Sequence, residues 1–123
     1  MKSSSLKSFV VQEHHASHLH WDLRLEMEGV LKSWAVPKSV PTSPKVKRLA
    51  VQVADHTLDF LHFEGEISEG EYGAGKIFIW DTGAYDLLKF EKERIEFVLH
   101  GKKVSGKYIL IHWKNKDWLL MKV

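Results

Sequence analysis

The stretch His20-Trp21-Asp22-Leu23-Arg24-Leu25-Glu26-Met27 alternates polar and apolar side chains. Successive side chains of a β-strand point to opposite faces, so this alternation predicts a strand with one face in the core. The apolar side chains belong in that core. His20, Asp22 and Arg24 therefore share the opposite face, where an imidazole, a carboxylate and a guanidinium lie close together.

Segments with the same period of two lie on both sides of this stretch. We expect strands at 9–12, 21–27, 30–36, 48–54, 76–80, 84–88, 94–100, 107–113 and 118–123. No segment has a convincing helical period, and a short helix is left open only at 41–47 and 58–69. Many short strands separated by turn residues predict an all-β fold, a compact closed or nearly closed β-barrel of about eight strands with at most short flanking helices. A site is then expected at the mouth or in the lumen of the barrel.

Composition places the chain among ordinary soluble proteins. Its 123 residues are 44% hydrophobic and 28% charged, the size of one domain. We expect a flexible N-terminal end at 1–8 and a single domain at 9–123. The absence of cysteine excludes disulfides and thiolate metal sites and fits the cytoplasm. No apolar run approaches the roughly 18 residues of a membrane span, so no membrane partner is expected. The net charge of +2 permits a nucleic-acid partner without requiring one.

Histidines are concentrated at the start of the strand predicted at 21–27 and in the residues before it. Four of the eight lie between His14 and His20. His20 and Asp22 are suited to bind one divalent cation, with His14 as a third ligand, and nitrogen and oxygen ligands suit Mn²⁺, Fe²⁺ or Zn²⁺. Arg24 beside the cation would suit a phosphate. A His-x-Asp pair also occurs by chance on protein surfaces. The residues alone therefore leave a metal site and an ordinary polar surface about equally favoured.

Other basic residues are weaker candidates. His56 follows a strand end, where it is either a surface residue or a donor and general acid toward a phosphate. Lys38 and Arg48 flank a proline-rich loop, and they are either solvated or part of an anion pocket with Arg24. The remaining histidines are interpreted as surface residues or as neighbours of the site: His15, His18, His62, His100 and His112.

One phosphate-binding motif is rejected. Residues 70–76 match the first seven positions of a P-loop, but Ile77 stands where a Ser or Thr is needed. The next segment is a predicted strand, whereas a P-loop leads into a helix. We interpret the segment as a glycine-rich turn.

Several ordered blocks resemble the 3′-phosphoesterase domain of bacterial DNA ligase D and its stand-alone archaeal relatives. The blocks are His14-x-Ala16-Ser17-x-Leu19-His20-x-Asp22-x-Arg24-Leu25-Glu26, Leu31 to Lys38, Arg48 to Val51, Asp55-His56, Phe63-Glu64-Gly65, Glu69 to Gly75 and Trp80-Asp81. The resemblance extends from about Phe9 to the end of the chain.

This resemblance implies a compact β-barrel that uses Mn²⁺ to process the 3′ ends of strands. A phosphodiesterase step would remove a 3′-terminal ribonucleoside, and a phosphomonoesterase step would convert the remaining 3′-phosphate to a 3′-OH in DNA repair. His14, His20 and Asp22 match the family's metal ligands, with Co²⁺ or Zn²⁺ as other ions that could bind. Arg24, Lys38, Arg48 and His56 match its phosphate-binding residues, and Arg24 and His56 match its catalytic ones.

Two positions depart from the family pattern. His15 stands where members often have Asp, and Phe60 stands where many have a Tyr that assists the chemistry. With no ligase or polymerase module in the sequence, the resemblance implies a stand-alone, monomeric enzyme. Its substrate would be the 3′ end of a DNA strand or of an RNA/DNA primer–template strand. Separate ligase, polymerase or end-joining proteins would be its partners.

Two other classes of function remain open from the residues. A cupin-like Fe²⁺ oxygenase also uses a His-x-Asp pair on a β-barrel, with its third ligand far downstream, for example at His100 or His112. A non-catalytic nucleic-acid-binding barrel would use aromatic stacking and basic residues, without a metal.

Overall fold

The computed structural model describes residues 6–123, and in this range the chain forms nine β-strands and one short 3₁₀ helix. The strands are β1 (Lys7–His15), β2 (Leu19–Met27), β3 (Val30–Val36), β4 (Lys47–His56), β5 (Gly65–Ile67), β6 (Gly75–Glu91), β7 (Arg94–His100), β8 (Ser105–Lys114) and β9 (Asp117–Lys122). The helix η1 (Leu58–His62) lies in one of the two stretches left open for a short helix. Between residues 6 and 123, no helix is long and apolar enough to cross a membrane.

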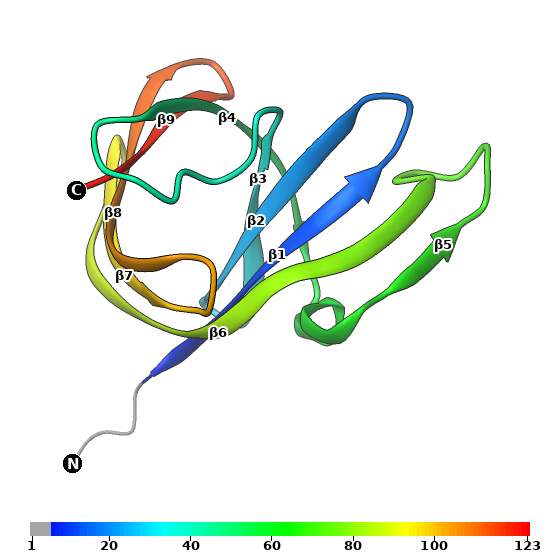
Figure 1. Ribbon diagram of the computed structural model, residues 1–123, viewed down its shortest axis with the longest axis horizontal. Helices are drawn as coiled ribbons and strands as arrows, with labels where there is room; N and C mark the ends of the chain where they lie inside the picture. Colours follow the sequence, from blue (N-terminus) through cyan, green and yellow to red (C-terminus); the bar gives the residue numbers. More distant parts are fainter. Residues whose placement is uncertain (1–5) are drawn as a thin grey trace.

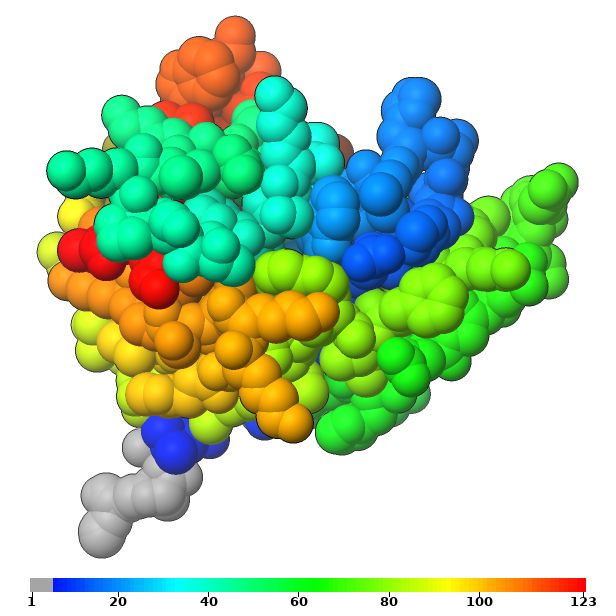
Figure 2. All heavy atoms as spheres, in the orientation of Figure 1, coloured from blue at the N-terminus to red at the C-terminus, as the bar shows by residue number. Residues whose placement is uncertain are grey.

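Eight of the strands close into an antiparallel barrel. Their order is β1-β2-β3-β4-β9-β8-β7-β6, and the pairing of β6 with β1 closes the ring. The all-β barrel predicted from the sequence is therefore confirmed. The β1–β2 hairpin and the β5–β6 segment extend beyond the barrel on the same side (Figure 1). Figure 2 shows them as two neighbouring projections, coloured blue and green.

Three elements differ from the sequence-based expectation. β6 is one strand of 17 residues where two were expected, because it changes partners from β1 to β7 along its length. Gly83 permits this change of partner, because the absence of a side chain leaves room for β7. A Cβ at position 83 would lie only 2.4 Å from the His100 carbonyl oxygen. The strand β5 has only three residues, too few for a periodic pattern. Of the expected flexible end at 1–8, residues 1–5 lie outside the described residues, and Lys7 and Ser8 are paired in β1.

Each of the eight barrel strands directs one face toward the interior of the barrel. Leu23 and Leu25 of β2 are fully buried there and are paired with Trp34 and with Phe9 in the neighbouring strands. The tyrosine hydroxyls that reach the core are satisfied, as Tyr108 donates to the Pro41 carbonyl at 2.6 Å. The polar face of β2 consequently lies on the outside of the barrel. The candidate site that β2 carries therefore lies on the outer face of the barrel. The expectation from the sequence, a site at the mouth or in the lumen, is wrong in this respect.

Asp81 anchors the β7–β8 loop to β6, and its substitution should destabilise the fold. Its side chain is buried, and Oδ1 accepts the N–H groups of Thr82 and Lys102 at 2.9 and 3.0 Å. Oδ2 accepts the N–H groups of Lys103 and Val104, both at 2.8 Å. An Asp81→Asn amide places an NH₂ group against two of these four donors. We expect the free energy of unfolding to fall by about 3 kcal/mol, measured by urea denaturation.

A matched control lies on the same strand. The side chain of Asp86 is 44% exposed and pairs only with His100 among the described residues. Asp86→Asn should change the free energy of unfolding by less than about 0.5 kcal/mol. Equal stabilities for the two variants would contradict the anchoring role of Asp81.

Candidate metal centre

The register of β1, β2 and β3 gathers polar side chains on one patch of the outer face. His14 of β1 is directly opposite His20 of β2, and Asp22 is paired with Gln12 of β1 and with Ala35 of β3. Directly opposed residues project to the same side of a sheet. The three predicted metal ligands are therefore neighbours because of strand pairing alone.

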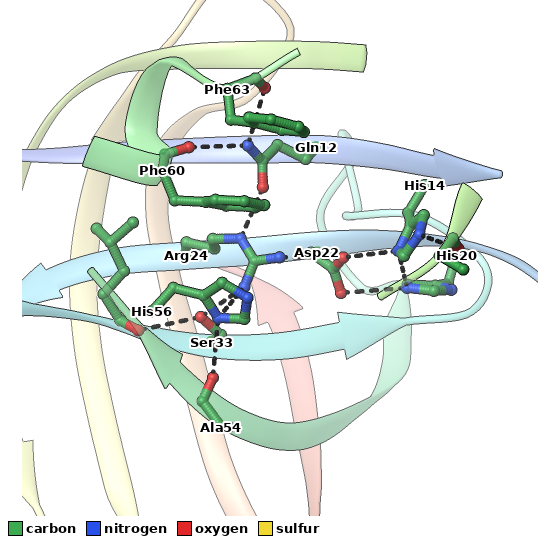
Figure 3. A network of polar contacts seen from close by, with 12 residues as sticks. Gln12, His14, His20, Asp22, Arg24, Ser33, Ala54, His56, Phe60 and Phe63 are labelled. Carbon is green, nitrogen blue, oxygen red and sulfur yellow. Dashed lines mark hydrogen bonds and ion pairs between the residues drawn. The ribbon is translucent and has the colours of Figure 1, made fainter. Parts of the chain in front are cut away.

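His14, His20 and Asp22 form a compact triad. Their ligand atoms all lie within 4.8 Å of one another. His14 Nδ1 is 3.2 Å from His20 Nε2 and 3.5 Å from an Asp22 carboxylate oxygen, and His20 Nε2 is 3.3 Å from the other carboxylate oxygen. Figure 3 shows the two rings and the carboxylate directed toward one another.

Backbone carbonyls fix the tautomers of both imidazoles. His14 Nε2 is 2.9 Å from the Ala74 oxygen, and His20 Nδ1 is 3.0 Å from the His18 oxygen. A carbonyl only accepts, so each of these ring nitrogens carries the proton and the facing nitrogen of each neutral ring holds a lone pair. Two lone pairs and a carboxylate then converge without a donor between them. This donor set fits a divalent cation, and its outer carbonyl contacts are those that orient histidine ligands in metal sites.

The electrostatics of the triad agree with this arrangement. In the protonated imidazolium form, the hydrogen bond from His20 to Asp22 raises the pKa of His20 more than partial burial lowers it. Burial on its own would raise the pKa of Asp22, but the hydrogen bond from His20 and the charge of Arg24 outweigh it and hold that pKa below its usual value. Asp22 is thus an ionised carboxylate at neutral pH, as a metal ligand requires.

Arg24 is the centre of a hydrogen-bond network behind the triad. Its residue surface is only 3% exposed. Nε donates to Gln12 Oε1 at 2.6 Å, and Nη1 donates to Ser33 Oγ at 2.9 Å. Nη1 also lies 3.0 Å from His56 Nδ1, and Nη2 donates to Asp22 Oδ2 at 3.4 Å. Of the five N–H groups of a guanidinium, one on Nη2 has no partner among the described residues.

The helix η1 covers this network. Gln12 Nε2 donates to the carbonyls of Phe60 and Phe63, at 2.9 and 3.2 Å. The Phe60 ring stacks on that of Phe63 and lies 4.9 Å from the Arg24 guanidinium carbon. Phe60 thus excludes water from one face of the guanidinium. Its ring has no hydroxyl to offer a substrate.

His56 lies beside Arg24 on the wall of the site. Burial and the neighbouring Arg24 charge both lower the pKa of His56, so its imidazole is neutral at pH 7. Arg24 Nη1 can only donate, so Nδ1 accepts in this contact and the proton is on Nε2. An alternative tautomer would donate from Nδ1 to the Ala54 carbonyl, 3.1 Å away. In the first tautomer His56 retains an N–H donor for a ligand.

A cavity of about 940 Å³ opens over these residues. It is lined by the triad, Arg24, His56, Phe60 and the β5–β6 segment. Lys38 and Arg48 do not line it, so the structure leaves these two predicted phosphate ligands outside. Lys38 is exposed after β3, and Arg48 is half-buried on β4 with its Nε unpartnered among the described residues.

The other histidines divide between the cavity rim and distant surfaces. His15 lines the cavity and pairs with Glu13 at 2.6 Å. His100 pairs with Asp86, and His112 bonds the Asn115 carbonyl, both away from the cavity. His100 and His112, the two downstream histidines considered as a third ligand for a cupin-like oxygenase, therefore do not reach this site.

Comparison with known proteins decides the family. The model of the DNA ligase D 3′-phosphoesterase domain matches residues 12–112. The chain belongs to this family. The relatives include the multifunctional non-homologous end joining DNA repair protein LigD of Mycobacterium tuberculosis, 49% identical over 116 residues, and LigD of Pseudomonas aeruginosa, 49% identical over 129 residues. These alignments cover 91% and 98% of this chain but only 15% of each relative, so the chain corresponds to a small part of those proteins.

The structure adds residues to this candidate site that sequence reasoning missed. Gln12 and Ser33 are fully buried partners of Arg24, and the Ala74 carbonyl orients His14. Gln12 and Ser33 share the outer face with Arg24, so the period of two was a signal for both. The contact of the Ala74 carbonyl with His14 could not be predicted, because every residue has a backbone carbonyl and no residue type marks such a contact in the sequence.

Gly75 sets the distance between the β5–β6 segment and the triad of His14, His20 and Asp22. Its φ is 122°, and a Cβ there would lie 2.4 Å from the His15 carbonyl oxygen. Gly75→Ala should therefore push the Ala74 carbonyl away from His14. We expect the affinity for a divalent cation, with Mn²⁺ as the probe, to fall by about 10- to 100-fold, as when an outer partner of a metal ligand is lost.

Isothermal titration of the purified variant with Mn²⁺ would measure this change. Gly29→Ala is the matched control, because Gly29 also has a positive φ of 81° but has no atom within 4 Å of a Cβ. Its affinity for Mn²⁺ should be that of the unchanged protein. Unchanged affinity in Gly75→Ala would contradict the role of this close approach.

Proposed function

We propose that this chain is a Mn²⁺-dependent phosphoesterase that processes 3′ ends during DNA end joining, with residues 9–123 as its single domain. The observation that carries the proposal is the compact triad of His14, His20 and Asp22, which lines one cavity together with the buried guanidinium of Arg24. Membership of the DNA ligase D 3′-phosphoesterase family supports the same reaction class. The full LigD relatives are named for non-homologous end joining, which supports the process.

The residues divide into a metal-binding set and a phosphate-binding set. His14 Nδ1, His20 Nε2 and an Asp22 oxygen would hold the cation, which when bound supplies a Lewis acid for a phosphate oxygen. Arg24 offers its remaining Nη2–H, and its charge is little screened because the side chain is buried. His56 offers Nε2–H from the cavity wall. These donors stabilise negative charge on phosphate oxygens that the cation does not contact.

Two hydrolytic steps are part of the proposal. The first removes a 3′-terminal ribonucleoside and leaves a 3′-phosphate, and the second converts that phosphate to a 3′-OH. Arg24 and His56 would act as catalytic residues, with His56 as a donor to the leaving oxygen or to the phosphate. Lys38 and Arg48, which lie outside the cavity, would contact the strand backbone beyond the reacting phosphate.

A labelled primer–template tests the function. The DNA primer carries a 5′ label and ends in one ribonucleotide, and it is incubated with Mn²⁺, Mg²⁺ or EDTA before gel analysis. We expect shortening to a 3′-phosphate and then conversion to a 3′-OH, with Mn²⁺ only. Accumulation of the 3′-phosphate would overturn the second step and would point to the missing hydroxyl at Phe60.

A pair of histidine variants distinguishes a loss of activity caused by the site from a general effect of replacing a histidine. His56→Ala should slow both steps, whereas His100→Ala, on an exposed and distant histidine, should leave them unchanged. Absence of turnover with every metal, together with retained binding of the primer–template, would replace the enzyme with a binding module.

A further inference from the structure

Tyr72 is an exposed aromatic residue on the wall of the catalytic cavity. It is 76% exposed, and it lines the same cavity as the metal triad and Arg24. The other strongly exposed aromatic side chains in residues 6–123 are Phe78, Phe90 and Trp113, and none of them lines this cavity. Within that range no other aromatic ring is paired with the ring of Tyr72. Its face is therefore available to a ligand.

The cavity is larger than a phosphate group requires. Its volume of about 940 Å³ is in the range of sites that hold whole small molecules. Arg24 is the only Lys or Arg side chain among its described lining residues, and it lies at the triad. The other residues of segment 67–75 that line the cavity are Ile67, Glu69, Gly70, Gly73, Ala74 and Gly75, and Glu69 is the one charged side chain among them. This end therefore suits an uncharged flat group better than a second phosphate.

The position of Tyr72 is tied to the triad. The Glu71 N–H donates to the Ser68 carbonyl at 3.2 Å, and the Ala74 N–H donates to the Glu71 carbonyl at 3.1 Å. The first turn ends just before Tyr72, and the second contains it. The carbonyl of Ala74, two residues further on, is the one that contacts His14. The ring is thus carried by a backbone segment anchored to a metal ligand, while the ring itself remains unpacked.

We propose that Tyr72 stacks on a nucleobase next to the phosphate that is cleaved. The inference rests on the proposed function, because the triad and Arg24 must hold that phosphate for the base to reach the ring. Stacking on an aromatic face tolerates any base. Such a contact would position strand ends of any sequence.

The test compares Tyr72→Ala with the unchanged protein on three primer–templates. The first carries all its bases, the second lacks the base of the terminal ribonucleotide, and the third lacks the base before it. The KM of Tyr72→Ala on the first substrate should rise by about 5- to 150-fold, the range for loss of one stacked base, with little change in kcat. On the substrate that lacks the stacked base, the two proteins should have the same KM. Tyr72→Trp should restore the KM on the first substrate.

A binding measurement keeps the inference separate from the proposed function. Fluorescence anisotropy with Mn²⁺, on versions of the three primer–templates whose 3′-terminal linkage resists hydrolysis, gives the Kd of each protein, and Kd should follow the pattern of KM. Trp113→Ala, which removes an aromatic ring 61% exposed on β8, is the control and should change neither constant. A similar loss on all three substrates, or no loss on any, would overturn the stacking role. Failure of the unchanged protein to cleave any substrate would overturn the proposed function, and Kd alone would then decide the role of Tyr72.

Discussion

Replacement of His20 by alanine should abolish both Mn²⁺ binding and metal-dependent turnover. His20 supplies one of three ligand nitrogens or oxygens, and two remaining ligands are too few to hold the ion. Mn²⁺ at 100 times its Kd should stabilise the unchanged protein by about 2.7 kcal/mol, and this increment should disappear in the variant. Thermal unfolding with Mn²⁺ and with EDTA measures it, and the primer–template gel measures turnover.

The metal-free variant should remain folded, since the His20 side chain is 22% exposed and lies outside the core. His18→Ala is the matched control. The His18 ring is exposed, whereas its backbone carbonyl, which contacts His20 Nδ1, is kept in the variant. His18→Ala should therefore bind Mn²⁺ as before. A His20→Ala protein that retained Mn²⁺-induced stabilisation would remove His20 from the metal site.

Replacement of Arg24 by alanine should reduce both stability and rate. The variant leaves the Asp22 carboxylate and Gln12 Oε1 buried without this donor, and loss of one partner of a buried pair costs about 3–5 kcal/mol. Loss of its charge at the phosphate should lower kcat by about 10²- to 10³-fold. Urea denaturation and single-turnover kinetics measure the two effects.

Two further variants show which property of Arg24 accounts for the losses in Arg24→Ala. Arg24→Lys keeps the charge but cannot match the fork of donors to Gln12, Ser33 and Asp22, so it should recover only part of each loss. Arg94→Ala removes a half-exposed arginine that pairs with Glu96 on the surface, and it should leave rate and stability near their original values. An Arg24→Ala protein as stable and active as the original would show that the network is dispensable.

The shared face of the candidate metal ligands and the composition of the core could be predicted from the sequence, because both depend on a local rule. Alternation on β2 places His20, Asp22 and Arg24 on one face wherever the strand lies. The same rule assigns Leu23 and Leu25 to the interior, and the structure buries both completely. The position of His14 required one more element, the hairpin that pairs it with His20.

The cavity and the environment of Arg24 required the tertiary structure. Residues 57–75 contain a short helix, a three-residue strand and turns, and none of these has a period that predicts a partner. They nevertheless supply Phe60 over the guanidinium, the Ala74 carbonyl behind His14 and the exposed ring of Tyr72. Contacts between such segments and the sheet depend on how the chain closes around the barrel.

The amino-acid sequence by itself determined the all-β barrel and the shared face of the triad and Arg24, because strand stereochemistry acts between near neighbours. Only the tertiary structure decided that this face lies outside the barrel, that Arg24 is buried, and that Lys38 and Arg48 lie outside the cavity. The physical reason is that burial and convergence depend on barrel closure and on the packing of a non-periodic segment, which bring together residues far apart in the chain.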